Sequence, residues 1–102
     1  MSISTAVSAS GDTVTITISG RFDFSIHRDF RLAYEDAKST SEKPSFVVDL
    51  SGTDYMDSSA LGMLLLLREH AGGDESNIKI SNCRPVIKEI LDIANFDKLF
   101  AI

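Results

Sequence analysis

The sequence is poor in the residues that form covalent, metal and redox sites. It contains one cysteine, Cys83, which excludes an internal disulfide. The only histidines are His27 and His70, and together with Cys83 they match no metal-ligand spacing. We therefore expect no metal and no cofactor, and we expect Cys83 to be a small apolar residue that is buried or half-buried.

Positive charge and long apolar runs are also scarce. Ten basic residues stand against 15 acidic ones, giving a net charge of −5, whereas nucleic acids and anionic membranes attract clustered lysines and arginines. The longest apolar run lies within residues 60–67, far short of the roughly 20 residues that a membrane-spanning helix needs. Residues 1–5 lack the basic start of a secretory signal. These features predict a cytoplasmic protein without nucleic-acid binding or membrane insertion, and we expect a monomer.

The pattern of apolar residues predicts one domain, residues 1–102, of the α/β class. Residues 3–8 and 13–19 alternate as in a hairpin, with Val14, Ile16 and Ile18 facing the core and Gly20 ending the second strand. Apolar residues then recur at helical spacing over 26–37, with Ser25 as the expected N-cap. Residues 39–44 are typical of a surface loop.

The second half of the chain predicts a strand–helix–strand unit and a final helix. Residues 46–50 are consecutively apolar, as in a strand buried on both faces. A helix over 57–72 and a strand over 78–80 follow. Pro85 suits the first position of the last helix, and Asn95 suits its left-handed end. The expected fold is a mixed sheet of about four to five strands with helices packed on it, and with Phe96, Leu99, Phe100 and Ile102 folded onto the core.

The segment that is the best candidate for a chemical function joins the central strand to the helix that follows. Asp57, Ser58 and Ser59 stand at the helix start, where backbone amides lack partners inside the helix. Those amides and the helix dipole favour negative charge. Phosphorylation of a serine there would add about −1.5 to −2 charges, opposed by the neighbouring Asp57. An ordinary N-cap, which contributes about 1 kcal/mol of stability, explains the same residues without any function.

Two features of this helix leave their interpretation open. Gly62 costs roughly 1 kcal/mol relative to alanine in a helix interior. Together with Ala60 it leaves the first turn without bulk, which suits close packing of the helix on the sheet or close approach by a partner. We expect the leucines of this helix to belong to the core; they are Leu61, Leu64, Leu65 and Leu67.

At this segment the chain resembles the STAS domain family (sulphate transporter and anti-sigma factor antagonist domains), in particular its single-domain bacterial antagonists. Members carry Asp-Ser-Ser or Asp-Ser-Thr and then Gly-Leu-Gly after an apolar strand, and here residues 56–62 read Met-Asp-Ser-Ser-Ala-Leu-Gly. Four flanking segments also resemble the family: residues 20–23, its Gly-x-x-Asp turn; residues 47–51, its central strand; Gly72-Gly73; and residues 84–100, its last helix and tail. The resemblance covers nearly the whole chain.

The resemblance implies a partner-switching mechanism without catalysis by this chain. An unphosphorylated antagonist binds an anti-sigma factor or a similar regulator, a protein serine kinase (often that partner) phosphorylates and releases it, and a serine phosphatase resets it. The acceptor is the first hydroxyl residue after the motif aspartate, which is Ser58, with Ser59 as the fallback. The implied partner-binding residues are Asp23, Met56, Asp57, Ser58, Ser59, Ala60, Leu61 and Gly62. Ala60 departs from the family's glycine, which leaves the identity of the partner open.

Three other classes of protein share some of these features. A hydrolase nucleophile elbow needs Gly-x-Ser-x-Gly, which is missing around Ser58, and His70 at the far end of the helix is about 15 Å away. A phospho-aspartate receiver with Asp49 at its strand end lacks the acidic cluster that holds magnesium. The remaining alternative is a non-phosphorylated STAS module that serves as a structural subunit of a membrane transport complex, such as a lipid transporter with an ATPase.

Overall fold

Alternating polar and apolar residues form the first hairpin of a four-stranded sheet. The computed structural model describes residues 2–8, 11–35 and 44–102. Strands β1 (Ser2–Val7) and β2 (Thr13–Phe22) pair in antiparallel fashion. Strands β3 (Ser45–Met56) and β4 (Ile78–Ser81) continue the sheet in parallel, in the order β1-β2-β3-β4. The predicted mixed α/β sheet is confirmed, with four strands.

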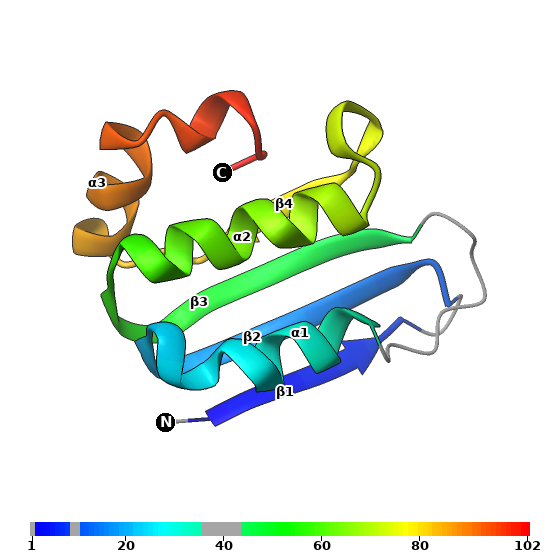
Figure 1. Ribbon diagram of the computed structural model, residues 1–102, viewed down its shortest axis with the longest axis horizontal. Coiled ribbons are helices and arrows are strands. Elements are labelled where there is room, and N and C mark those ends of the chain that lie inside the picture. The colour runs from blue at the N-terminus through cyan, green and yellow to red at the C-terminus, as the bar shows by residue number, and fades with distance from the viewer. Residues whose placement is uncertain (1, 9–10, 36–43) are drawn as a thin grey trace.

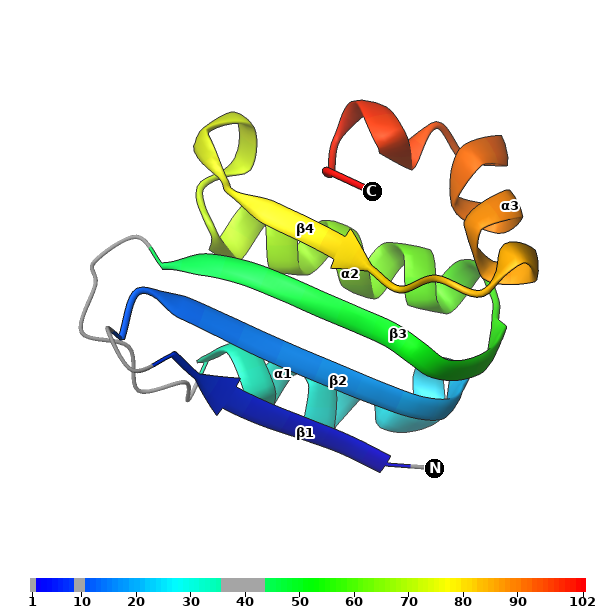
Figure 2. The same cartoon turned by 180° about the vertical axis from the view of Figure 1, so that it is seen from behind.

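The main helices cover one face of this sheet. The short 3-10 helix η1 (Phe24–Ile26) leads into α1 (His27–Glu35), and α2 (Ser58–His70) connects β3 to β4. Figure 1 shows α1 and α2 side by side over the strands, with α3 (Pro85–Ile93) beyond the start of α2. Seen from behind, the strands lie in front and no described helix crosses them (Figure 2). The short helices η2 (Gly73–Glu75) and η3 (Phe96–Lys98) complete the described elements.

The core lies between the covered sheet face and the helices. Val14, Ile16 and Ile18 are fully buried, as the alternation predicted. The expectation that residues 46–50 are buried on both faces was wrong. Phe46, Val48 and Leu50 are buried, whereas the alternate residues Val47 and Asp49, which strand geometry places on the opposite face, are half-buried. Because only one sheet face is covered, the strand alternates despite its apolar sequence.

Strands β2 and β3 extend further than the sequence predicted. Gly20 adopts a left-handed φ of 86° but does not end the strand, because β2 continues to Phe22. Register shifts between Thr17 and Ser19 and between Gly20 and Arg21 place extra residues on β3. The buried Thr53 hydroxyl donates to the Ile18 carbonyl at 2.7 Å and ties the strands between these shifts. Phe22 therefore ends directly beside Met56, and the two strands finish level with each other.

The remaining expectations were met in part. Pro85 begins α3, Asn95 is left-handed, and Phe96 and Phe100 are buried as predicted. Leu99 and Ile102 are exposed instead, and so is Leu65 of α2, whereas Leu64 and Leu67 are buried. Leu61 packs against the core while partly buried. The loop predicted over 39–44 and the end of the predicted helix at Ala37 fall mostly outside the described residues.

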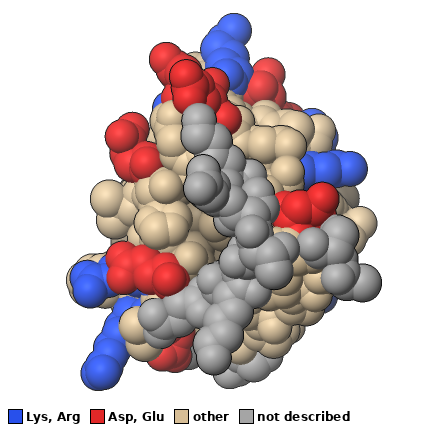
Figure 3. Space-filling model, turned by 90° about the vertical axis from the view of Figure 1, so that its right-hand side faces the viewer, with Lys and Arg blue, Asp and Glu red and all other residues tan. Residues whose placement is uncertain are grey.

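Charged side chains are mixed over the end of the molecule that lies away from the start of α2. Acidic and basic groups alternate there, with no patch of one sign on the part of that face that is described (Figure 3). The only free cysteine of the described residues, Cys83, is half-buried as expected. Burial raises the pKa of its thiol.

Candidate functional site

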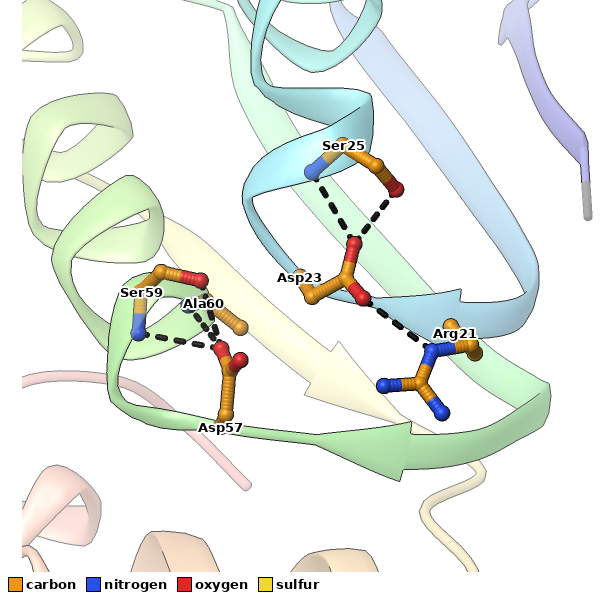
Figure 4. Close-up of polar contacts among 6 residues, drawn as sticks. All are labelled: Arg21, Asp23, Ser25, Asp57, Ser59 and Ala60. Atoms are coloured by element: carbon orange, nitrogen blue, oxygen red, sulfur yellow. Dashed lines mark hydrogen bonds and ion pairs between the residues drawn. The ribbon is translucent and has the colours of Figure 1, made fainter.

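Two parallel strands end side by side, and each is followed by an aspartate that caps a helix. Asp23 follows β2 and precedes η1, and Asp57 follows β3 and precedes α2. Both aspartates keep an extended backbone, with φ of −141° and −128°. Figure 4 shows the two capped turns next to each other at this end of the sheet.

The Asp57 carboxylate occupies the start of α2. Its Oδ1 accepts hydrogen bonds from the Ser59 amide at 3.0 Å, the Ala60 amide at 3.2 Å and the Ser59 hydroxyl at 2.5 Å. The sequence led us to expect that these amides lack partners and welcome an added anion. That expectation was wrong for Ser59 and Ala60, because the protein's own carboxylate already holds them. A further anion here would lie beside the Asp57 carboxylate, and the amides of Ser59 and Ala60 would not be free to bind it.

The two serines of this turn differ in what their hydroxyls do. The Ser59 side chain is half-buried, and its hydroxyl donates to Asp57. Ser58, the first residue of α2, is exposed, and within the described part of the chain its hydroxyl makes no hydrogen bond. Only the Ser58 hydroxyl therefore combines exposure with freedom from internal bonds.

The turn after β2 repeats the same arrangement. Asp23 Oδ1 accepts the Ser25 amide at 2.9 Å and the Ser25 hydroxyl at 2.5 Å. The prediction that Ser25 caps the helix was wrong, because Asp23 is the N-cap and Ser25 donates to it. Phe24 stands at the position that corresponds to Ser58 and is 62% exposed. The repeated Asp-x-Ser spacing was the sequence signal for this second cap, and our sequence reasoning missed it.

Arg21 and Tyr55 complete the site, although the sequence predicted a functional role for neither of them. They are register partners on β2 and β3. Arg21 Nε donates to Asp23 Oδ2 at 3.1 Å, and its guanidinium carbon lies 3.8 Å from the centroid of the Tyr55 ring. Figure 4 shows Arg21 beside Asp23, on the side of Asp23 that faces away from the Asp57 turn. A cation stacked on an aromatic ring and paired with a carboxylate has a defined position despite its exposure.

Hydrogen bonds lower the pKa of both capping carboxyls. For Asp57 the Ser59 hydroxyl has the largest effect, whereas the charge of Asp23 acts in the opposite direction and raises the Asp57 pKa. For Asp23 the Ser25 hydroxyl and amide lower the pKa most, and Arg21 adds to them. The two carboxylates are therefore ionised at neutral pH and close enough to repel each other.

The structure removes two residues from the predicted partner-binding surface. The side chains of Met56 and Ala60 are buried, so neither side chain can contact a partner in this conformation. A Cβ atom on Gly62 would meet nothing within 4 Å, which excludes close packing on the sheet as the reason for this glycine. The other predicted residues are exposed or half-buried; they are Asp23, Asp57, Ser58, Ser59, Leu61 and Gly62.

Within the described residues, neither histidine contacts Ser58. The His27 ring stacks on Phe24 with centroids 4.8 Å apart, and His70, the last residue of α2, packs against Tyr34 at 4.9 Å. The described residues contain no group of three histidine, cysteine or acidic side chains suited to a metal ion. Across those same residues, no helix has the length and apolar character to cross a membrane.

A four-stranded mixed sheet whose β3 strand leads through Asp-Ser-Ser into a helix defines the class of STAS domains. The chain belongs to the family described as Mlab, STAS domain, whose model matches residues 5–101. It is 53% identical over 102 residues to a STAS-domain containing protein of Pseudomonas aeruginosa (strain UCBPP-PA14), covering 100% of this chain and 99% of that protein.

Solved structures share the fold at low sequence identity. An anti-sigma factor antagonist from Mycobacterium paratuberculosis superposes with a TM-score of 0.72 at 22% identity, over 97% of this chain and 83% of that one. A sulfate transporter family protein from Wolinella succinogenes gives a TM-score of 0.69 at 14% identity, over 94% and 80% of the two chains. These similarities concern the fold, which both kinds of protein use.

Proposed function

We propose that this protein is an anti-sigma factor antagonist that acts by partner switching. The unphosphorylated form binds an anti-sigma factor or a similar regulator. A protein serine kinase transfers the γ-phosphoryl group of ATP to the Ser58 hydroxyl, which loses its proton as ADP leaves, and the partner is released. A serine phosphatase restores the binding form. The observation that carries the proposal is that the Ser58 hydroxyl is exposed and makes no hydrogen bond to the described residues. The neighbouring Ser59 hydroxyl, in contrast, is hydrogen-bonded to Asp57.

The charge at this site explains why phosphorylation would change binding more than folding. The phosphate adds about −1.5 to −2 charges next to Asp57, whose carboxylate continues to cap α2 through Ser59 and Ala60. The helix start therefore keeps its cap while the surface becomes strongly anionic. A partner that packs closely here would have to desolvate that charge, which is unfavourable.

The helix face beyond Ser58 is suited to a partner. Ser58, Gly62 and Leu65 recur at positions i, i+4 and i+7 and share one side of α2, and all three are exposed. Leu66, which is 53% exposed, widens the apolar part of this surface. A partner bound to this face would contact the serine and exposed leucines together, so a phosphate at its end would disturb the contact.

Two experiments test the proposal. The protein is incubated with extract of the source cells and ATP, and phosphate is located by mass spectrometry, with Ser58→Ala and Ser59→Ala variants as a matched pair. We expect phosphate on wild type and Ser59→Ala but none on Ser58→Ala. Pull-downs should retain a regulator with Ser58→Ala and lose it with Ser58→Asp. If no growth condition yields phosphate on either serine, the switch is rejected.

The second candidate is a structural STAS subunit of a membrane transport complex, without phosphorylation. Its support is the fold shared with the sulfate transporter family protein and the exposed leucines of α2. This candidate predicts that a membrane transport ATPase is recovered equally with wild type, Ser58→Ala and Ser58→Asp. Loss of all partners on Ser58→Asp would instead favour the switch.

We expect no catalysis by this chain in either case. No histidine contacts Ser58 within the described residues, and the Asp57 carboxylate is engaged in capping α2. A serine nucleophile needs a base within hydrogen-bond reach. Hydrolysis of a generic ester that disappears in Ser58→Ala would contradict this expectation.

A further inference from the structure

Arg21, a cation of the site, lies on the strand beside the one that leads to Ser58. We propose that Arg21 is the internal counter-ion of phosphoserine 58 and exchanges its Asp23 contact for the phosphate. This inference rests on Ser58 being the phosphate acceptor. It assigns a phosphate-binding role to a residue outside the Asp-Ser-Ser motif.

The register of β2 and β3 relates Arg21 to the end of β3. Residues i and i+2 of a strand share a face, and the Nε bond to Asp23 brings the Arg21 side chain forward to the end of β2. Because Phe22 and Met56 are register partners, Asp57 follows β3 at the same level as Asp23 follows β2. Neighbouring strands are about 4.8 Å apart, so Arg21 belongs to the strand directly beside the one that leads through Asp57 to Ser58.

The Tyr55 ring directs Arg21 towards β3. The guanidinium carbon lies 3.8 Å from the ring centroid, and Tyr55 precedes Ser58 by three residues on the strand that enters α2. Arg21 could have remained over its own strand, but the stacking holds it above the neighbouring one. In the proposed exchange the guanidinium gives up its Nε contact with Asp23 and turns towards Ser58.

The balance of charge favours such an exchange. Within the described residues, Arg21 is the only cation that hydrogen-bonds to, pairs with or stacks on Asp23, Tyr55 or Asp57. It meets Asp23 through Nε alone, and its terminal nitrogens make no hydrogen bond to a described carboxylate. A phosphate dianion carries more charge than a carboxylate and accepts two parallel guanidinium bonds. Phosphorylated Ser58 should therefore compete with Asp23 for Arg21.

The exchange would carry the signal from one helix start to the other. Arg21 bound to phosphate leaves Asp23 with only its Ser25 contacts, so the charge of the η1 turn becomes uncompensated. The exposed Phe24 lies in that turn. Phosphorylation of α2 would in this way alter the surface presented by the residues before α1.

The test measures the ionisation of the phosphate itself. Phosphoserine is incorporated at position 58 during synthesis, and the phosphorus resonance is followed against pH. The second pKa of phosphoserine is about 6, and a nearby cation lowers it because it stabilises the dianion. We expect Arg21→Gln to raise this phosphate pKa by about half a unit or more.

Arg31→Gln is the matched control. Arg31 also meets a carboxylate through Nε, at 3.4 Å from Glu35, and its side chain is 57% exposed against 59% for Arg21. Both variants lose the same charge, but the proposal expects the phosphate pKa to shift clearly in Arg21→Gln and only slightly in Arg31→Gln. Arg21→Lys should give an intermediate shift, because an ammonium replaces the two-pronged contact with a single charge. Circular dichroism checks that each variant folds.

Equal titration curves for Arg21→Gln and Arg31→Gln would overturn the proposal. Because the phosphate is introduced during synthesis, the titration does not depend on a cellular kinase. Failure to find phosphate on Ser58 in cells would reject the proposed switch by a separate measurement.

Discussion

Asp23 and Asp57 end two neighbouring parallel strands at the same level and cap the helices that follow in the same way. Each accepts the amide and the hydroxyl of the serine two residues later. The two carboxylates repel each other, and only Asp23 is paired with Arg21. The charge of Asp57 is therefore the less compensated of the two, and Asp57 directly precedes Ser58.

The two serines should differ in stability as they differ in contacts. Ser59→Ala removes a hydrogen bond to Asp57 and should lower the free energy of unfolding by about 1 kcal/mol. Ser58→Ala removes no internal contact and should stay within about 0.5 kcal/mol of wild type. Urea unfolding of both variants measures the difference. Comparable losses would mean that the Ser58 hydroxyl has a structural contact after all.

Asp57→Ala should destabilise the protein more than Ser59→Ala does. The substitution frees the amides of Ser59 and Ala60 as well as the Ser59 hydroxyl, so α2 begins without any cap. The expected result is a lower urea midpoint with an unchanged slope. Asp54→Ala is a suitable control, since Asp54 is exposed on β3. A midpoint equal to that of the control would contradict the capping role.

Stability should fall in acid through the capping carboxyls. The pKa values of Asp23, Asp49 and Asp57 are lowered from 3.8 by hydrogen bonds, of which the Ser25, Ser51 and Ser59 contacts are the largest. The folded state thus holds fewer protons than the unfolded state, and this stabilisation is fully present above the unfolded value. It is lost as the pH falls below about 4 and through the lowered folded values.

Urea midpoints measured between pH 7 and pH 2.5 test this dependence. Asp57→Asn should have a lower midpoint at neutral pH and a shallower fall in acid, because one of the depressed carboxyls no longer titrates. A wild-type midpoint that rises on acidification would have the wrong sign for these three groups.

Gly62→Ala should stabilise the free protein. The added Cβ meets nothing within 4 Å, and alanine favours a helix interior over glycine by roughly 1 kcal/mol. Gly72→Ala is the contrasting variant, because Gly72 has a φ of +116° that alanine rarely adopts, and it should be destabilising. Thermal unfolding separates the two. A Gly62→Ala variant that is more stable yet binds its partner less well would identify this glycine as a point of close approach.

Local sequence patterns were sufficient for most of the elements. Val14, Ile16 and Ile18 alternate in a way that permits one buried strand face, and Pro85 and Asn95 have backbone preferences that fix the ends of α3. Asp57 before an apolar run predicted the start of α2 for the same local reason. These features depend on neighbours within a few residues, which the sequence contains in full.

Errors arose where pairing partners decide the outcome. Glycine often ends a strand, but β2 remains hydrogen-bonded to β3 beyond Gly20 and continues to Phe22. Val47 is apolar, yet its face of the sheet has no described helix over it. Ser25 had the chemistry of a cap, but the longer strand places Asp23 at the cap position instead.

The sequence by itself determined that an aspartate and two serines begin a helix after an apolar strand, because capping is a local preference of residue types. Only the tertiary structure decided which of the two serines is exposed, since this depends on how α2 packs on the sheet. It alone also brought Arg21 over Tyr55, because the shifts in register between β2 and β3 set which residues lie opposite each other.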